Sequence, residues 1–147
     1  MNFSQTLADV VTVRQRFSRS VHLQRDWQIQ TGADALNGYH LTPCAHELLQ
    51  IIAGAQSRPA DRALTVVGPY GAGKSAFCVF LAGLISGGKA ESRVLRERDP
   101  ALARALGGDA RRLLAVPLVG SRAPLAPALV SGLRDALQKE APAIAET

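Results

Sequence analysis

The stretch GPYGAGKS, residues 68–75, constrains this chain more than any other part of its sequence. The apolar run LTVV, residues 64–67, enters it, and a second apolar run, residues 76–81, leaves it. The stretch fits the pattern G-x-x-x-x-G-K-[ST]. The fixed positions of that pattern are Gly68, Gly73, Lys74 and Ser75. A β-branched run before the glycines and a long apolar run after them predict a strand, a tight loop and a helix, in that order.

These residue types suit a loop that binds phosphate. Glycine lets backbone N–H groups approach a dense anion with no side chain in the way. A concave run of N–H groups that leads into a helix N-terminus makes an anion site. We expect Lys74 to reach the β- and γ-phosphates of ATP, and Ser75 to place its hydroxyl on Mg²⁺ as the metal ligand. The predicted cofactor-binding residues are Gly68, Pro69, Tyr70, Gly71, Ala72, Gly73, Lys74 and Ser75.

The rest of the chain alternates between helical and extended patterns. Thr42-Pro43 predicts a helix N-terminus, with threonine at the N-cap, proline at the first helical position and Gly54 as the stop. The predicted helices cover residues 42–54, 74–86, 99–107 and 125–139. The predicted strands cover residues 63–67 and 113–119. Such an alternation favours an α/β fold, in which helices cover both faces of a parallel sheet and the ligand lies at the carboxyl ends of the strands.

The charge balance is modestly basic. Lys and Arg number 17 against 12 Asp and Glu, a net charge of +5, which fits a phosphate ligand or nucleic acid but specifies neither. The densest basic stretch carries Arg14, Arg16, Arg19 and Arg25. Its spread favours a solvated or ion-pairing surface over a nucleic-acid patch.

Two cysteines and the N-terminus bear on the compartment. Cys44 and Cys78 lack CxxC spacing, which favours reduced, buried thiols in a cytoplasmic protein. The N-terminus has no basic region followed by an apolar core, so no signal peptide is indicated. The longest apolar stretch, residues 76–85, is too short to span a bilayer. We therefore expect a cytoplasmic protein with no membrane partner.

Four stretches of the chain resemble the N-terminal portion of large bacterial P-loop ATPases of the AAA+/STAND type, including ATP-binding proteins linked to anti-phage defence. They are FSRSVHLQRDW, GYHLTPCAHELL, LTVVGPYGAGKSAFCVFLAGLI and LAVPLVGSRAPLAPAL. Only the third, which contains the phosphate-binding loop GPYGAGKS (the Walker A motif), is a specific motif of this class. The resemblance implies the three-layer parallel sheet of a P-loop NTPase with strand order 5-1-4-3-2. Residues 64–67 would be its first strand and residues 113–119 its second.

The resemblance has two further implications for the chain. The second strand would lie at the sheet edge, where Pro117 is tolerated because it cannot donate a ladder hydrogen bond. The helix over residues 42–54 would pack near the adenine. Tyr39 and His40 would then lie either by the base or simply in a turn.

The chain departs from this class in its acidic residues. A hydrolytic site of this kind needs an apolar strand that ends in Asp, often followed by Glu. No apolar run after Ser75 ends in an acid, since LLAVPLV continues into Gly120-Ser121. No catalytic residue is assigned, and Arg122 is only a polar candidate for an arginine finger. Two non-adjacent strands make no stable sheet, so we expect an incomplete domain, truncated before the second acidic motif.

The domain prediction follows from these points. Residues 1–41 are expected to form an irregular N-terminal segment, and residues 42–147 a partial P-loop NTPase domain. The leading function is the ATP-binding module of a larger ATPase, which hydrolyses ATP in the full-length parent and not in this fragment. The absence of an N-K-x-D stretch favours ATP over GTP.

Two other functions stay open. One is a fragment of a small-molecule or nucleotide kinase, which shares the loop but needs basic residues in a lid. The other is a non-catalytic interaction fragment with a vestigial loop. ATP is the expected partner, and a homo-oligomer or a nucleic acid remains open for the full-length protein.

Overall fold

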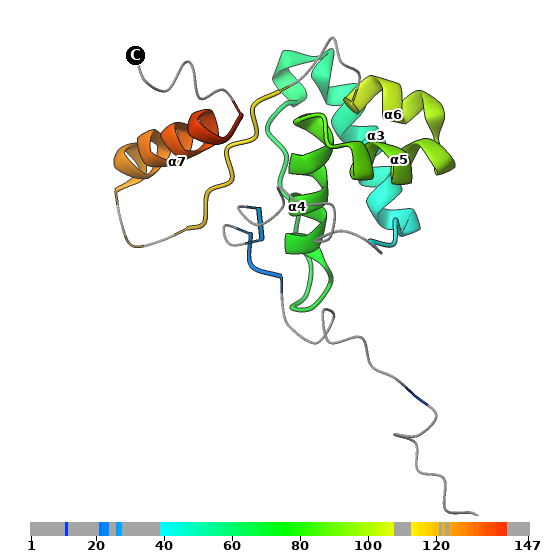
Figure 1. Cartoon of the computed structure of the whole chain (residues 1–147), viewed down its shortest axis with the longest axis horizontal. Coiled ribbons are helices and arrows are strands. Elements are labelled where there is room, and N and C mark those ends of the chain that lie inside the picture. Colours follow the sequence, from blue (N-terminus) through cyan, green and yellow to red (C-terminus); the bar gives the residue numbers. More distant parts are fainter. Residues whose placement is uncertain are drawn as a thin grey trace, which may run out of the picture.

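The computed structural model describes residues 11, 21–23, 26–27, 39–107, 113–120, 122 and 124–140. Helices dominate this part of the chain (Figure 1). In chain order they are α3 (Pro43–Gln56), the 3-10 helix η2 (Pro59–Asp61), α4 (Lys74–Ile85), α5 (Lys89–Arg98), α6 (Pro100–Gly107) and α7 (Leu125–Glu140). Most of the predicted irregular segment 1–41, including all four arginines of its basic stretch, lies outside the described residues.

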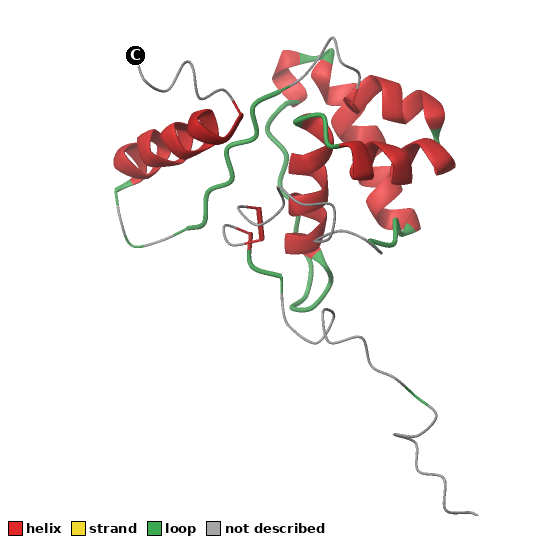
Figure 2. Cartoon of the chain, in the orientation of Figure 1, coloured by secondary structure: helices red, strands yellow, loops and turns green. Residues whose placement is uncertain are grey.

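The predicted α/β fold is wrong. No β-strand occurs among the described residues, and residues 63–67 and 113–119 run as extended loops (Figure 2). The one backbone hydrogen bond that either segment makes within the described chain joins the N–H of Leu113 to the carbonyl of Ile85, at 3.0 Å. A strand is stabilised by a neighbour about 4.8 Å away that accepts and donates ladder hydrogen bonds. Neither segment has such a neighbour among the described residues, so this part of the chain forms no three-layer parallel sheet.

Helices α3, α4, α5 and α6 pack together around the main hydrophobic core (Figure 1). The buried members of this core are Leu41, Ala45, Leu49, Phe77, Phe80, Leu84, Leu95, Leu102, Ala103 and Leu106. Helix α4 carries Phe80 and Leu84, both fully buried. The buried residues of α4 cover most of its circumference: Phe77, Val79, Phe80, Ala82, Gly83 and Leu84.

Helix α3 begins as predicted. The Thr42 side chain accepts a hydrogen bond from the N–H of Ala45 at 3.2 Å, and Pro43 occupies the first helical position. The helix continues beyond Gly54 to Gln56, so the predicted stop is wrong. Glycine in a helix interior costs only about 1 kcal/mol relative to alanine, and burial of Ala55 in the next position favours the continued helix.

Helix α5 has a buried face, although most of its residues are charged. Leu95 is fully buried, and the Glu91 side chain is buried with it. The Glu91 carboxylate lies against two glycines, Gly83 of α4 and Gly88. A Cβ added at Gly83 would stand 2.7 Å from Glu91 Oε1, closer than real Cβ atoms approach. The glycines therefore make room for the buried acid between α4 and α5.

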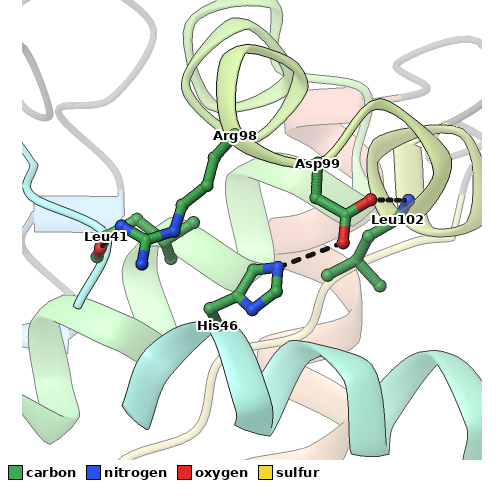
Figure 3. Close-up of polar contacts among 5 residues, drawn as sticks. All are labelled: Leu41, His46, Arg98, Asp99 and Leu102. Carbon is green, nitrogen blue, oxygen red and sulfur yellow. Dashed lines mark hydrogen bonds and ion pairs between the residues drawn. The ribbon is translucent and has the colours of Figure 1, made fainter. Parts of the chain in front are cut away.

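A polar clasp joins the start of α3 to the junction of α5 and α6 (Figure 3). His46 Nε2 lies 3.1 Å from Asp99 Oδ2. The other carboxylate oxygen of Asp99 accepts the N–H of Leu102 at 2.9 Å and so caps α6. Arg98 donates to the carbonyl of Leu41 at 3.0 Å. The Leu102 N–H, and after it His46, hold the pKa of the Asp99 carboxyl below its ordinary value.

Helix α7 lies apart from the four-helix core, on the far side of the extended segment 113–120 (Figure 1). Its Gly132 faces Leu118 of that segment, and no larger residue would fit there without a shift. Lys139 Nζ donates to the carbonyl of Trp27 at 2.6 Å and stands 4.0 Å from the centre of the Trp27 ring. Trp27 packs with Ala82 and Ala115 in a second, smaller core. This small core connects α4 with segment 113–120, and Lys139 ties α7 to it.

Two further predictions concern cysteines and membranes. Cys44 and Cys78 are free thiols with exposed side chains, so their predicted burial is wrong. Partial burial nevertheless raises the pKa of the Cys78 thiol. Among the described residues, no helix is both long enough and apolar enough to cross a bilayer.

Candidate functional site

Residues 68–73 form a loop between the extended segment and α4. Gly71 and Gly73 both have φ near +82°, a left-handed conformation that glycine adopts without strain. A Cβ added at either position would meet no other atom within 4 Å. Backbone conformation, rather than crowding, therefore explains why these two positions are glycine. The open space above them also leaves the loop backbone accessible.

The loop leads directly into the N-terminus of α4. Gly73 is the N-cap, and no side chain of the described residues caps the helix. The first backbone hydrogen bond runs from the N–H of Phe77 to the carbonyl of Gly73, at 2.9 Å. Within the described chain, no backbone acceptor is found for the N–H groups of the first helical turn, residues 74–76. Those N–H groups and the positive end of the helix dipole face the loop, as an anion site requires.

The Lys74 side chain folds back over the same loop. Its Nζ donates to the carbonyl of Gly68 at 2.8 Å and to the carbonyl of Pro69 at 2.7 Å. An ammonium group has three donors, so one remains for another acceptor. The two bonds hold the cation against the backbone of the loop.

The other predicted loop residues are accessible. Ser75 is exposed in the first turn of α4. Tyr70 is 98% exposed at the tip of the loop. The N–H of Ala72 donates to the carbonyl of Pro69 at 3.3 Å, which closes a turn around Tyr70 and Gly71. The structure therefore brings residues 68–75 together as one accessible loop.

Tyr39 contacts the core rather than the open side of the loop. Its ring stacks on Phe80 with a centroid distance of 4.5 Å and an interplanar angle of 16°. Burial, and secondly the nearby Cys78 thiol, raise the pKa of Tyr39. This ring is committed to packing against α4, which leaves its exposed neighbour His40 as the accessible member of the pair.

The described residues offer no ready-made metal centre. Among them, no cluster of three or more His, Cys, Asp or Glu side chains has metal-binding geometry. Asp99, an acid at the end of α5, accepts the Leu102 N–H and pairs with His46. Arg122, the residue that the sequence offers as a candidate arginine finger, is exposed. A magnesium ion at this loop would depend on Ser75, phosphate oxygens and water, which are ligands that it accepts.

Two interactions were missed by sequence reasoning. One is the pair of carbonyl contacts to Lys74, whose partners lie five and six residues earlier in the chain. The other is the His46–Asp99 pair, whose members are 53 residues apart. The helix predicted over residues 99–107 places Asp99 at a helix start, but no local signal points from Asp99 to His46.

The comparisons with protein families, curated proteins and solved structures gave no match to this chain.

Proposed function

We propose that the chain is an ATP-binding module that holds the phosphates of Mg-ATP in the loop GPYGAGKS. One observation carries this proposal: the left-handed Gly71 and Gly73, the uncapped N-terminus of α4 and the Lys74 ammonium all meet at residues 68–75. Each of the three features attracts an anion, because N–H groups, a helix dipole and a cation all present positive charge.

The backbone of the loop and the Lys74 side chain would bind different parts of the triphosphate. Backbone N–H groups of residues 71–75, apart from that of Ala72, which bonds to Pro69, would donate to phosphate oxygens, and the glycines would let those oxygens approach closely. Lys74 would neutralise the outer phosphates as a point charge. Its two bonds to Gly68 and Pro69 support this role, because they keep the ammonium beside the loop before any ligand arrives.

Mg²⁺ fits the same loop through Ser75. The serine hydroxyl stands exposed in the first turn of α4, next to the backbone that would hold the phosphates. Magnesium binds few protein ligands and keeps several waters when it is shared with substrate phosphates. The Ser75 hydroxyl would be the protein ligand, with phosphate oxygens and water as the other ligands.

The test is titration of a fluorescent ATP analogue against the chain and its Lys74→Ala variant. We expect affinity to fall at least tenfold, about 1.4 kcal/mol, because the variant loses the cation of the loop. Arg134→Ala is the matched control, since Arg134 is an exposed basic residue on another helix, α7. Equal affinity of all three proteins would overturn the proposal.

Ser75→Ala tests the metal separately. We expect its affinity to match that of the wild type when EDTA removes Mg²⁺ and to be weaker when Mg²⁺ is present. A loss of equal size with and without Mg²⁺ would show that Ser75 contacts phosphate or shapes the loop rather than binding the metal.

A further inference from the structure

One exposed face of α5 carries a stripe of basic side chains, Lys89, Arg93 and Arg96. At 100° per residue they fall within an arc of about 60°, and they span about 10 Å along the helix axis. The opposite side of α5 is buried through Glu91 and Leu95. The three side chains therefore project to solvent from one side of a helix that the core holds in place.

The basic stripe is not used in internal contacts of the described chain. No ion pair or hydrogen bond of these three side chains is found there. Other basic residues do have partners: Arg58 pairs with Asp61 at 3.0 Å, and Arg62 donates to the carbonyl of Gln56 at 2.9 Å. Glu97, at the edge of the stripe, lies one turn from Arg93 without forming an ion pair with it.

We propose that this stripe binds the phosphate backbone of a nucleic-acid duplex. Each strand of a duplex presents one phosphate per 3.4 Å of axis, so a row of about 10 Å can engage successive phosphates of one strand. Guanidinium groups suit phosphate oxygens because their planar donors bind in pairs. The net charge of +5 adds attraction at longer range.

The chemistry of the face favours nucleic acid over an acidic protein. Protein interfaces are anchored in their centres by aromatic, apolar and arginine side chains that pack together and exclude water. None of the exposed large hydrophobic residues of the described chain lies on α5 or α6. The exposed side chains of α5 are all charged: Lys89, Arg93, Arg96, Glu97 and Arg98. A charged face without an apolar anchor suits phosphates. Binding of a duplex at this face is independent of the proposed ATP site, because it needs no bound nucleotide.

The experiment is fluorescence anisotropy of a labelled 20-base-pair DNA duplex with the whole chain, without nucleotide, from 25 to 200 mM NaCl. The test variant is Lys89→Gln/Arg93→Gln/Arg96→Gln. Affinity falls as salt rises, and each lost phosphate contact should make the slope of log affinity against log salt shallower by about 0.9. The slope of the triple variant should therefore be shallower than that of the wild type by about 2.7. Arg58→Gln/Arg62→Gln/Arg134→Gln removes as many charges elsewhere and should keep most of the slope.

Two further measurements keep the result decisive. Arg93→Lys/Arg96→Lys retains the charges and should bind the duplex with a slope close to that of the wild type. Circular dichroism should give the triple variant the helical content of the wild type. No binding at 25 mM NaCl, equal losses in the two triple variants, or equally strong competition by polyglutamate would each overturn the proposal.

Discussion

At the scale of single residues, the loop depends on the backbone conformation of Gly73. Its φ of +82° is one that residues with a Cβ rarely adopt, yet nothing stands within 4 Å of the place where a Cβ would go. We expect Gly73→Ala to lower the free energy of unfolding by about 1–2 kcal/mol through backbone strain alone. Urea unfolding followed by circular dichroism measures this.

Gly120→Ala is the matched control for that substitution. Gly120 also has open space around it, but its φ lies outside the left-handed region. Alanine there should leave stability unchanged or raise it by up to about 1 kcal/mol, because it restricts the unfolded chain. Equal effects at the two positions would show that φ does not govern the cost.

At the scale of elements, the contact between α4 and α5 depends on the missing side chain of Gly83. Gly83→Ala would drive a methyl group into the buried Glu91 carboxylate, since the new Cβ would lie 2.7 Å from Oε1. We expect a loss of about 1–3 kcal/mol, the usual cost of overpacking. Gly54→Ala, in the exposed part of α3 with its nearest neighbour atom at 3.8 Å, should instead gain about 0.5–1 kcal/mol.

A double variant tests whether Glu91 causes that loss. In Gly83→Ala/Glu91→Ala the clashing carboxylate is absent. The double variant should therefore lose less stability than the sum of the losses in the Gly83→Ala and Glu91→Ala single variants. Strict additivity in urea unfolding would mean that the methyl group at position 83 meets some other obstacle.

The clasp between α3 and α6 should make stability depend on pH. The pKa of Asp99 is lowered in the folded chain, first by the Leu102 N–H and then by His46. The ionised carboxylate therefore contributes its full stability above the ordinary aspartate pKa, and the contribution is lost as pH falls through the folded pKa. Asp99→Asn, which keeps an N-cap oxygen, should be less stable than the wild type at neutral pH. The difference should shrink once the pH falls below the ordinary aspartate pKa of about 3.9.

Urea unfolding of both proteins from pH 3 to pH 7 measures this difference. His46→Gln removes the histidine that pairs with Asp99 but leaves the hydrogen bond from the Leu102 N–H intact. It therefore separates the contribution of His46 to the lowered pKa of Asp99 from that of Leu102. A stability gap between wild type and Asp99→Asn that stays constant across the whole range would contradict the assignment of charge to Asp99.

At the scale of the whole molecule, exposed apolar residues gather on three segments. Ten of the fourteen exposed large hydrophobic residues of the described chain lie on residues 64–67, residues 113–119 or α7. The set includes a leucine stripe of α7, formed by Leu125, Leu129 and Leu133, because α7 packs on its neighbour through Gly132 rather than through these leucines. Clustered apolar surface of this kind binds hydrophobic dyes and other apolar surfaces.

We expect Leu125→Gln/Leu129→Gln/Leu133→Gln to reduce the fluorescence of a hydrophobic dye without lowering the melting temperature. The three side chains are 70%, 45% and 45% exposed, so the folded chain loses little packing. Ile51→Gln is the control, since Ile51 is 55% exposed on α3, away from these segments. A large fall in melting temperature would contradict the exposure of the stripe.

The sequence by itself determined the features that depend on neighbouring residues. Thr42-Pro43 and Asp99-Pro100 specified two helix starts, because a cap acts on N–H groups within three residues of it. The glycines and Lys74 specified the loop and the start of α4, because conformation at Gly73 and helix propensity are local. Binding of Mg-ATP at that loop stays a prediction.

Only the tertiary structure decided the features that depend on distant partners. The runs LTVV and LLAVPLV have strand composition, but a strand also needs a paired neighbour, and neither run has one among the described residues. Burial of Glu91 required the glycines of α4, and the His46–Asp99 pair joins residues 53 positions apart. Local composition cannot encode such contacts, because each is stabilised only after the helices have packed together.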